Sequence, residues 1–187
     1  MQRISRISMA IGLVALLAGC ATPQYETGYF NASASQPYTL DSGDRLRVLV
    51  YGQDSLSNTY AVDGSGNISV PLIGSVPVRG LSTHAAALAL QQRLRGGYLR
   101  DPQVSVEVDA YRPFFVLGEV TTAGQYPYIN GMTVENAVAV AGGFTPRASH
   151  RSATLTRIIH GRAVTGTVPM TQLVRPGDTI AVKERFF

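Results

Sequence analysis

Gly43-Asp44-Arg45-Leu46-Arg47-Val48, at residues 43–48, and Gly177-Asp178-Thr179-Ile180-Ala181-Val182, at residues 177–182, share the pattern Gly-Asp-x-aliphatic-x-Val. In each copy we expect the glycine to supply a turn and the aspartate to accept a hydrogen bond from a nearby backbone amide. The apolar side chains at every second position then predict a half-buried strand. The repeat is therefore interpreted as a structural signature, and it indicates two halves built in related ways.

Two strands are expected at the start of the first half. Leu46, Val48 and Val50 alternate with other residues and predict a strand over 45–51. The segment Asp63-Gly64-Ser65-Gly66 predicts a turn, because glycine tolerates positive φ. A second strand follows over 67–72, where Pro71 suggests a sheet edge or a strand end.

A helix and a closing strand complete this half. The helix is expected over 84–95, with Ser82 or Thr83 as its N-cap. Its expected apolar positions are Ala85, Leu88, Leu90 and Leu94. Alternating valines over 104–108 predict the last strand of this half. We therefore expect the first domain to span residues 37–111.

The order of strands and helix expected in the second half, 112–187, predicts a small β-grasp-like domain. The expected fold class of the chain is therefore α+β. A short helix is expected after Thr133, since apolar residues follow at i, i+3, i+4 and i+7, and it should end at Gly142 and Gly143. Strands are expected over 114–120, 125–128, 153–159, 163–168 and 179–183. The third and fourth of these form a hairpin.

The first twenty residues have the pattern of a secretory signal. Residues 1–19 combine a basic start, an apolar core too short for a comfortable membrane span, and small residues before Cys20. This ending resembles a bacterial lipobox, in which the cysteine thiol carries a diacylglycerol; a signal peptide with an incidental cysteine is the alternative. Several acyl chains would hold the protein on a membrane. Because alanine follows the cysteine, the resemblance favours the outer membrane of a Gram-negative bacterium, facing the periplasm.

Residues 20–36 are expected to form a flexible, lipidated tether. They lack periodicity and are rich in Ser, Ala, Pro and Gly. Tyr25, Tyr29 and Phe30 either pack on a neighbour or the lipid interface, or are scattered aromatic residues of a mobile tail.

Composition excludes several classes of protein. A chain of 187 residues allows one or two small domains, and 45% hydrophobic residues is too many for a wholly disordered chain. The net charge of +4, with only 15% charged residues, argues against nucleic acid as a partner. The single cysteine cannot form an internal disulfide.

No enzyme is predicted. The sequence has no Gly-x-Ser-x-Gly elbow and no phosphate-binding Gly-x-x-x-x-Gly-Lys-Ser/Thr loop, and no pair of carboxylates stands out. His84, His150 and His160 have no carboxylate or cysteine at metal-ligand spacing. We therefore expect neither a catalytic residue, a metal site nor a cofactor.

The arginines offer two candidate surfaces for an acidic polymer. Arg45 and Arg47 share one strand face, and Arg93, Arg95 and Arg100 cluster near the end of the first helix. An ordinary solvated surface is the favoured interpretation of both groups.

Several motifs share their order and spacing with a known family. In the first half they lie at 38–46, 62–74, 78–82 and 101–106. They resemble the polysaccharide export domain of the Wza-type family of outer-membrane lipoproteins. In the second half, motifs resemble a soluble-ligand-binding β-grasp (SLBB) domain at 116–120, 124–126, 141–145 and 176–180. The matching residues are expected to be structural: Gly43, Asp44, Asp63, Gly66, Pro71, Gly74, Gly118, Gly124, Gly142, Gly143, Gly177 and Asp178.

This resemblance implies transport without catalysis. It implies outer-membrane subunits that assemble into a homo-oligomeric ring, through which capsular polysaccharide or exopolysaccharide passes, coupled to an inner-membrane co-polymerase. Small domains with strand edges can form such closing interfaces with their own copies. The alternative is a non-pore-forming periplasmic adapter or glycan-binding lipoprotein. The residues that contact polysaccharide are left unassigned.

The sequence departs from larger relatives at its C-terminus. Those relatives carry further domains and an amphipathic helix, whereas this sequence ends at Lys183-Glu184-Arg185-Phe186-Phe187. We therefore expect a periplasmic collar, anchored by Cys20, with a separate protein forming the outer-membrane passage.

Overall fold

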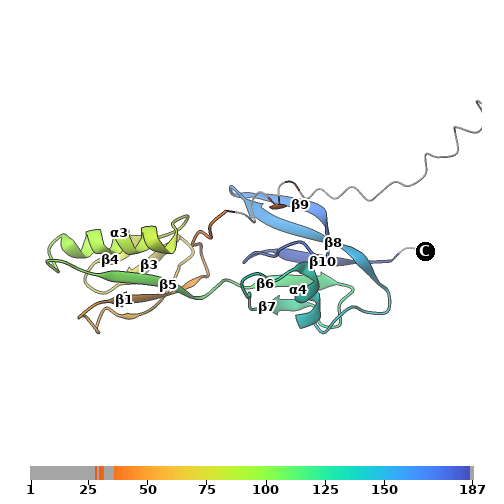
Figure 1. Ribbon diagram of the computed structural model, residues 1–187, viewed down its shortest axis with the longest axis horizontal. Helices are drawn as coiled ribbons and strands as arrows, with labels where there is room; N and C mark the ends of the chain where they lie inside the picture. The colour runs from red at the N-terminus through yellow and green to blue at the C-terminus, as the bar shows by residue number, and fades with distance from the viewer. Residues whose placement is uncertain (1–27, 29, 32–35, 186–187) are drawn as a thin grey trace, which may run out of the picture.

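The computed structural model describes residues 28, 30, 31 and 36–185, which form two halves arranged end to end (Figure 1). Each half has its own hydrophobic core, and the chain passes between them twice: Phe30 belongs to the second core and Leu40 to the first, and the chain returns to the second half from β5 to β6. The fold is α+β, as predicted.

The elements of the first half are β1 (Arg45–Val50), β2 (Asn58–Ala61), β3 (Asn67–Val70), β4 (Gly74–Pro77), α3 (Thr83–Arg95) and β5 (Val104–Ala110). Those of the second half are β6 (Phe114–Gly118), β7 (Gly124–Tyr126), α4 (Val134–Val140), β8 (Ala148–Ile159), β9 (Arg162–Pro169) and β10 (Thr179–Glu184).

The first half combines a three-stranded antiparallel sheet, a two-stranded hairpin and one helix. The sheet has the order β2-β1-β5, and β3 pairs with β4 beside it. The alternation predicted for β1 is confirmed, because Leu46, Val48 and Val50 are all buried. Strand β3 ends at Val70, immediately before Pro71, as its position suggested.

Helix α3 packs on β5 and is capped by Ser82, whose Oγ accepts a hydrogen bond from Ala85 N at 3.1 Å. The expected apolar face of this helix was partly wrong. Leu88 is exposed, since it lies about 145° around the helix from the centre of the buried face. The buried residues of the helix are Ala86, Ala87, Leu90 and Leu94.

Strands β2 and β4 were missed by the sequence analysis. Each is four residues long and carries few apolar side chains. Strand β2 pairs with β1, and β4 pairs with β3, so backbone hydrogen bonds to a neighbouring strand define both elements. A period-two hydrophobic pattern needs a longer stretch to stand out.

The second half is a mixed five-stranded sheet with one helix, the β-grasp-like arrangement that was predicted. The strand order is β7-β6-β10-β8-β9; β10 runs parallel to β6, and the other pairs are antiparallel. Helix α4 begins after Thr133, whose side chain forms a capping box with Asn136. The predicted hairpin turn is confirmed, with positive φ at His160 (50°) and Gly161 (75°) between β8 and β9. Strand β8 begins earlier than expected, at Ala148.

Phe30 belongs to the core of the second half. Its side chain is 1% exposed and lies in one cluster with Phe114 and Leu155. The Arg157 guanidinium lies 5.6 Å from the centre of the Phe30 ring, and Arg157 NH1 donates a hydrogen bond to Phe30 O at 3.2 Å. Of the two alternatives left open for Phe30, the structure therefore supports packing and not a scattered residue of a mobile tail. The signal segment 1–19, Cys20, Tyr25 and Tyr29 lie outside the described residues.

Gly118 is expected to tolerate no side chain. Its φ is +84°, and an added Cβ would lie 2.1 Å from Val182 O in β10. Gly131 has the same backbone conformation (φ +83°) with no atom within 4 Å, so it serves as the matched control. We predict that Gly131→Ala lowers the free energy of unfolding by about 1 to 2 kcal/mol, and that Gly118→Ala lowers it by more than twice as much. Urea denaturation measures both, and equal losses would contradict the close approach of β6 and β10.

Candidate functional site

The two Gly-Asp turns of the sequence repeat meet at the junction between the halves. Both glycines have positive φ, +91° at Gly43 and +85° at Gly177. In each turn the aspartate accepts a hydrogen bond from the amide three residues earlier: Asp44 Oδ2 from Asp41 N at 2.9 Å, and Asp178 Oδ2 from Arg175 N at 2.7 Å. This is the geometry that the repeated pattern predicted.

Asp44 is fully buried and joins the first half to the linker. Its Oδ1 accepts a hydrogen bond from Arg112 N at 2.9 Å. Its Oδ2 accepts one from Tyr38 OH at 2.5 Å and lies 3.4 Å from Arg112 NH1. Burial raises the pKa of Tyr38 above its ordinary value, and the hydrogen bond to Asp44 raises it further. Tyr38 therefore stays protonated and remains a donor to Asp44.

Asp178 forms a buried ion pair with Arg157. Arg157 Nε donates to Oδ1 at 2.9 Å and Arg157 NH2 to Oδ2 at 2.7 Å, a two-pronged contact. Burial raises the pKa of the Asp178 carboxyl, and the hydrogen bond from Arg157 opposes that shift. Because both side chains are at most 5% exposed, each needs the other as its counter-charge.

Arg112 lies between the two turns. A Cβ on Gly43 would lie 3.3 Å from Arg112 Cβ, and a Cβ on Gly177 would lie 2.9 Å from Arg112 Nε. Gly177 N also donates to Pro113 O in the linker, at 3.0 Å. Both glycines thus allow a close approach to Arg112, and through it the first half and the linker contact the second half.

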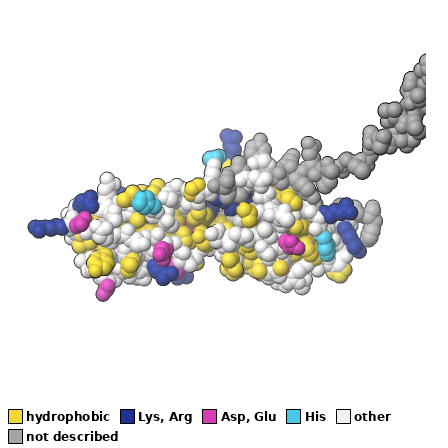
Figure 2. All heavy atoms as spheres, in the orientation of Figure 1, with side chains coloured by type: hydrophobic (Ala, Val, Ile, Leu, Met, Phe, Trp, Pro, Cys, Tyr) yellow, Lys and Arg dark blue, Asp and Glu magenta, His cyan; other side chains and the backbone are white. Residues whose placement is uncertain are grey.

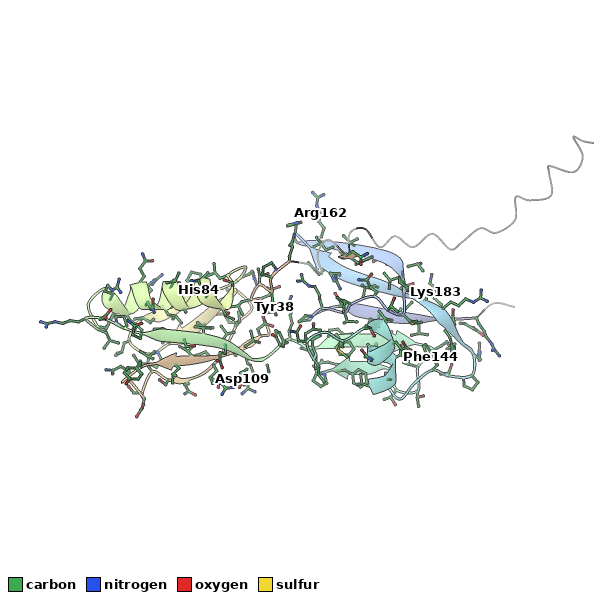
Figure 3. All side chains as sticks on the ribbon, in the orientation of Figure 1. Tyr38, His84, Asp109, Phe144, Arg162 and Lys183 are labelled. Carbon is green, nitrogen blue, oxygen red and sulfur yellow. The ribbon has the colours of Figure 1, made fainter. Side chains whose placement is uncertain are left out.

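Three tyrosines extend this junction. Tyr38 and Tyr111 lie edge to face with ring centres 4.9 Å apart, and Tyr111 and Tyr128 do so at 5.3 Å. Tyr38 comes from the first half, Tyr111 from the linker and Tyr128 from the second half; Figure 3 shows Tyr38 between the two ribbons. Burial raises the pKa of Tyr128.

Two clefts open at the junction. The larger, about 340 Å³, is called the arginine cleft and is lined by Gln36, Tyr38, Thr39, Leu40, Asp41, Arg79, Gly80, Arg112, Arg157, Ile158, Ile159, His160, Gly161, Arg175, Pro176, Gly177 and Asp178. The smaller, about 210 Å³, is called the tyrosine cleft and is lined by Gln36, Tyr38, Tyr111, Tyr128, Asn130, Gly131, Leu173, Val174, Arg175 and Pro176. The two clefts share Gln36, Tyr38, Arg175 and Pro176, so they adjoin.

Arg79 holds two loops of the first half together. Its Nε donates to Asp41 Oδ1 at 3.0 Å and its NH2 to Gly64 O at 2.9 Å, and NH2 also contacts Ser42 Oγ. Gly66 lies so close that an added Cβ would be 2.5 Å from Arg79 Cβ.

The other motif residues do not converge on the junction. Asp63 Oδ1 accepts hydrogen bonds from Ser65 N and Asn67 N, at 2.8 and 2.9 Å, in the turn before β3. Pro71 lies in the turn after β3, and Gly124 begins β7. Positive φ is found at the remaining turn glycines Gly74, Gly118, Gly142 and Gly143.

The arginines chosen from the sequence lie away from both clefts. Arg45 and Arg47 are exposed and lie 3.9 and 3.8 Å from the same carboxylate, Asp109. Arg95 lies 3.6 Å from Asp101 at the end of α3. Figure 2 shows basic side chains at the far end of the first half and again at the waist between the halves. No local sequence pattern groups Arg79, Arg112, Arg157 and Arg175, because they are far apart in the chain.

The histidines do not converge either. His84 is exposed on α3, His150 stacks on Phe144 with ring centres 4.2 Å apart, and His160 lies at the rim of the arginine cleft. Within the described part of the chain, no three His, Cys, Asp or Glu side chains are grouped as metal ligands would be. Likewise, none of the helices in that part has the length and apolar character needed to cross a bilayer.

The junction is expected to loosen when Arg112 is truncated. Arg112→Ala removes the contacts of its guanidinium with Asp44 and Tyr38, and hydrogen bonds to a charged group contribute about 1.5 to 3 kcal/mol each. We predict amide hydrogen exchange at least about 10-fold faster at residues 38–44 and 111–115. Arg93→Ala, on the exposed face of α3, is the control and should leave these amides unchanged. Equal exchange in both variants would show that Arg112 does not hold the halves together.

Comparison with known proteins agrees with this architecture. The profile of the polysaccharide biosynthesis/export protein family matches residues 32–109, and that of the SLBB domain matches residues 113–168. The chain is 37% identical over 153 residues to the exopolysaccharide production protein ExoF of Rhizobium meliloti, covering 74% of this chain and 35% of that protein.

Two further relatives are more distant. The EPS I polysaccharide export outer membrane protein EpsA of Ralstonia nicotianae is 28% identical, over 90% of this chain and 54% of its own length. The polysialic acid transport protein KpsD of Escherichia coli is 27% identical, over 58% of this chain and 20% of its own length. This chain thus spans between a fifth and about half of these relatives. The chain belongs to the polysaccharide export protein family, with an SLBB domain after its export domain.

Proposed function

We propose that this chain is a subunit of an oligomeric polysaccharide export collar, lipid-anchored at Cys20 in the outer membrane and facing the periplasm. The collar conducts capsular polysaccharide or exopolysaccharide and performs no catalysis. Family membership supports the export role, and the outer-membrane relative EpsA supports the location. The polysaccharide reaches the collar from an inner-membrane co-polymerase.

The observation that carries the oligomer is a set of exposed apolar side chains on one face of the second sheet. The core side chains of β6, β8 and β10 pack against α4 on one face. The opposite face presents Phe115, Leu117 and Ile158, which are 39%, 48% and 64% exposed. Exposed apolar patches on small domains mark interaction sites. Strands β7 and β9 also end the sheet as open edges, through which copies of one chain can associate.

A non-pore-forming glycan-binding adapter is the second candidate. The two clefts at the junction favour it, since concave sites lined by both halves can hold a saccharide in a monomer. The two functions differ in oligomeric state, which is therefore the property to measure first.

We predict a discrete multimer for the acylated chain in mild detergent, measured by multi-angle light scattering. Leu117→Asp should shift the population toward monomer, because a carboxylate on the apolar face opposes its burial. Leu88→Asp is the matched control, since Leu88 on α3 is 52% exposed and Leu117 is 48% exposed. A wild-type monomer at every concentration would contradict the collar and favour the adapter.

Cys20→Ser should release the protein from the membrane fraction and abolish polysaccharide export, because a serine cannot receive the lipid that anchors the chain. Thr22→Ser, two residues away, is the control and should retain both properties. Membrane fractionation and quantification of surface polysaccharide measure the two effects. Normal surface polysaccharide in Cys20→Ser cells would contradict an obligatory lipid anchor.

A further inference from the structure

We infer that the two adjoining clefts form one binding site for an acidic saccharide segment, with Arg175 binding a sugar carboxylate and the tyrosine cleft holding the neighbouring ring. This inference rests on the proposed function, because it names the chemical class of the polymer that the chain handles. It assigns a binding role to residues that the sequence analysis left unassigned.

The arginine cleft has an excess of positive charge that centres on Arg175. Its lining includes four arginines and two aspartates. Three of the arginines have carboxylate partners: Arg79 with Asp41, Arg112 with Asp41 and Asp44, and Arg157 with Asp178. Within the described residues, the Arg175 guanidinium has no carboxylate within 4.0 Å, and its one hydrogen bond goes from NH2 to Gln36 O at 2.6 Å; Asp178 contacts only the backbone amide of Arg175. Most of its five N–H donors are therefore available to a ligand.

The position of Arg175 is electrostatically unfavourable without an anion. Burial lowers the pKa of Arg175 and the nearby positive charge of Arg157 lowers it further, while the charge of Asp178, which is already paired with Arg157, offsets these two effects only in part. A half-buried guanidinium beside a second guanidinium weakens the folded state unless an anion offsets it. A carboxylate suits this position, since arginine binds carboxylates through two parallel N–H···O bonds.

The adjoining tyrosine cleft favours a saccharide over a small inorganic anion. The two clefts meet at Tyr38 and Arg175, so a ligand bound at Arg175 extends toward Tyr111 and Tyr128. Tyrosine presents both an apolar ring and a polar hydroxyl, which matches the mixed C–H and O–H surface of a sugar ring. The Asn130 amide adds a planar donor and acceptor at the same rim. A phosphate ion would occupy the arginine end only.

Isothermal titration calorimetry on the full-length chain in mild detergent tests the site. The probes are trigalacturonic acid, which is carboxylated, maltotriose, which is neutral, and inorganic phosphate. We expect trigalacturonic acid to bind at least 10-fold more tightly than either of the others. Affinity for it should fall as salt is raised, because the contact is charged.

Variants locate the site and separate binding from folding. Arg175→Gln should weaken trigalacturonic acid binding at least 10-fold, Arg175→Lys should restore part of it, and Arg93→Gln on α3 should leave it unchanged. The midpoint of urea unfolding of Arg175→Gln should equal or exceed that of the wild type, because the variant removes an unfavourable charge. A merely structural role for Arg175 would instead lower this midpoint.

Four results would overturn the inference. They are no binding of trigalacturonic acid by folded protein, equal affinity for maltotriose, equal affinity for phosphate, and unchanged affinity in Arg175→Gln.

Export in cells that lack the chain separates this inference from the proposed function. If those cells export no polysaccharide but the purified chain fails to bind, the inference fails and the export role stands. If binding follows the expected pattern but those cells export normally, the export role fails and an acidic glycan-binding protein remains.

Discussion

Two buried aspartates hold this molecule together at its waist, and the positions of the other junction residues depend on them. Asp44 and Asp178 each close a tight turn through a backbone amide, and each engages an arginine from a distant part of the chain. A carboxylate without its partner in such surroundings would carry a large desolvation cost, so removing one partner of either contact is expected to destabilise the junction. Arg112 lies against both turns and makes the linker part of the same network. The two halves are thereby oriented by polar contacts, while each half keeps a separate apolar core.

This arrangement explains why the concave surfaces lie where they do. The network fills the centre of the junction, and the clefts open beside it, bordered by side chains of the linker and of both halves. Most of the charge there is already neutralised by internal pairs, and Arg175 is left with a single backbone acceptor. If the proposed binding role is right, a site with one uncompensated charge would hold its ligand weakly enough to release it.

The exposed faces of the two sheets differ in their chemistry. The outer face of the first sheet pairs Arg45 and Arg47 with Asp109 in water, where such contacts contribute little to stability. The second sheet instead exposes Phe115 and Leu117. Burial of apolar area against a copy of the same chain would stabilise an assembly without any change in fold. The proposed self-association face and the proposed binding site meet at Ile158, which is exposed on the second sheet and also lines the arginine cleft.

The sequence by itself determined the local structure of this protein. Period-two alternation placed β1, capping residues placed the starts of α3 and α4, and the two Gly-Asp turns followed from residue chemistry that acts over a few positions. Family motifs supplied the order of the two domains. Tertiary structure decided the rest. The buried face of α3, the short strands β2 and β4, the burial of Phe30 and the pairing of Arg157 with Asp178 all depend on neighbours distant in the chain. A side chain's partner is set by where the backbone brings it, and no local pattern records that, which is why the site at the junction emerged only from the folded chain.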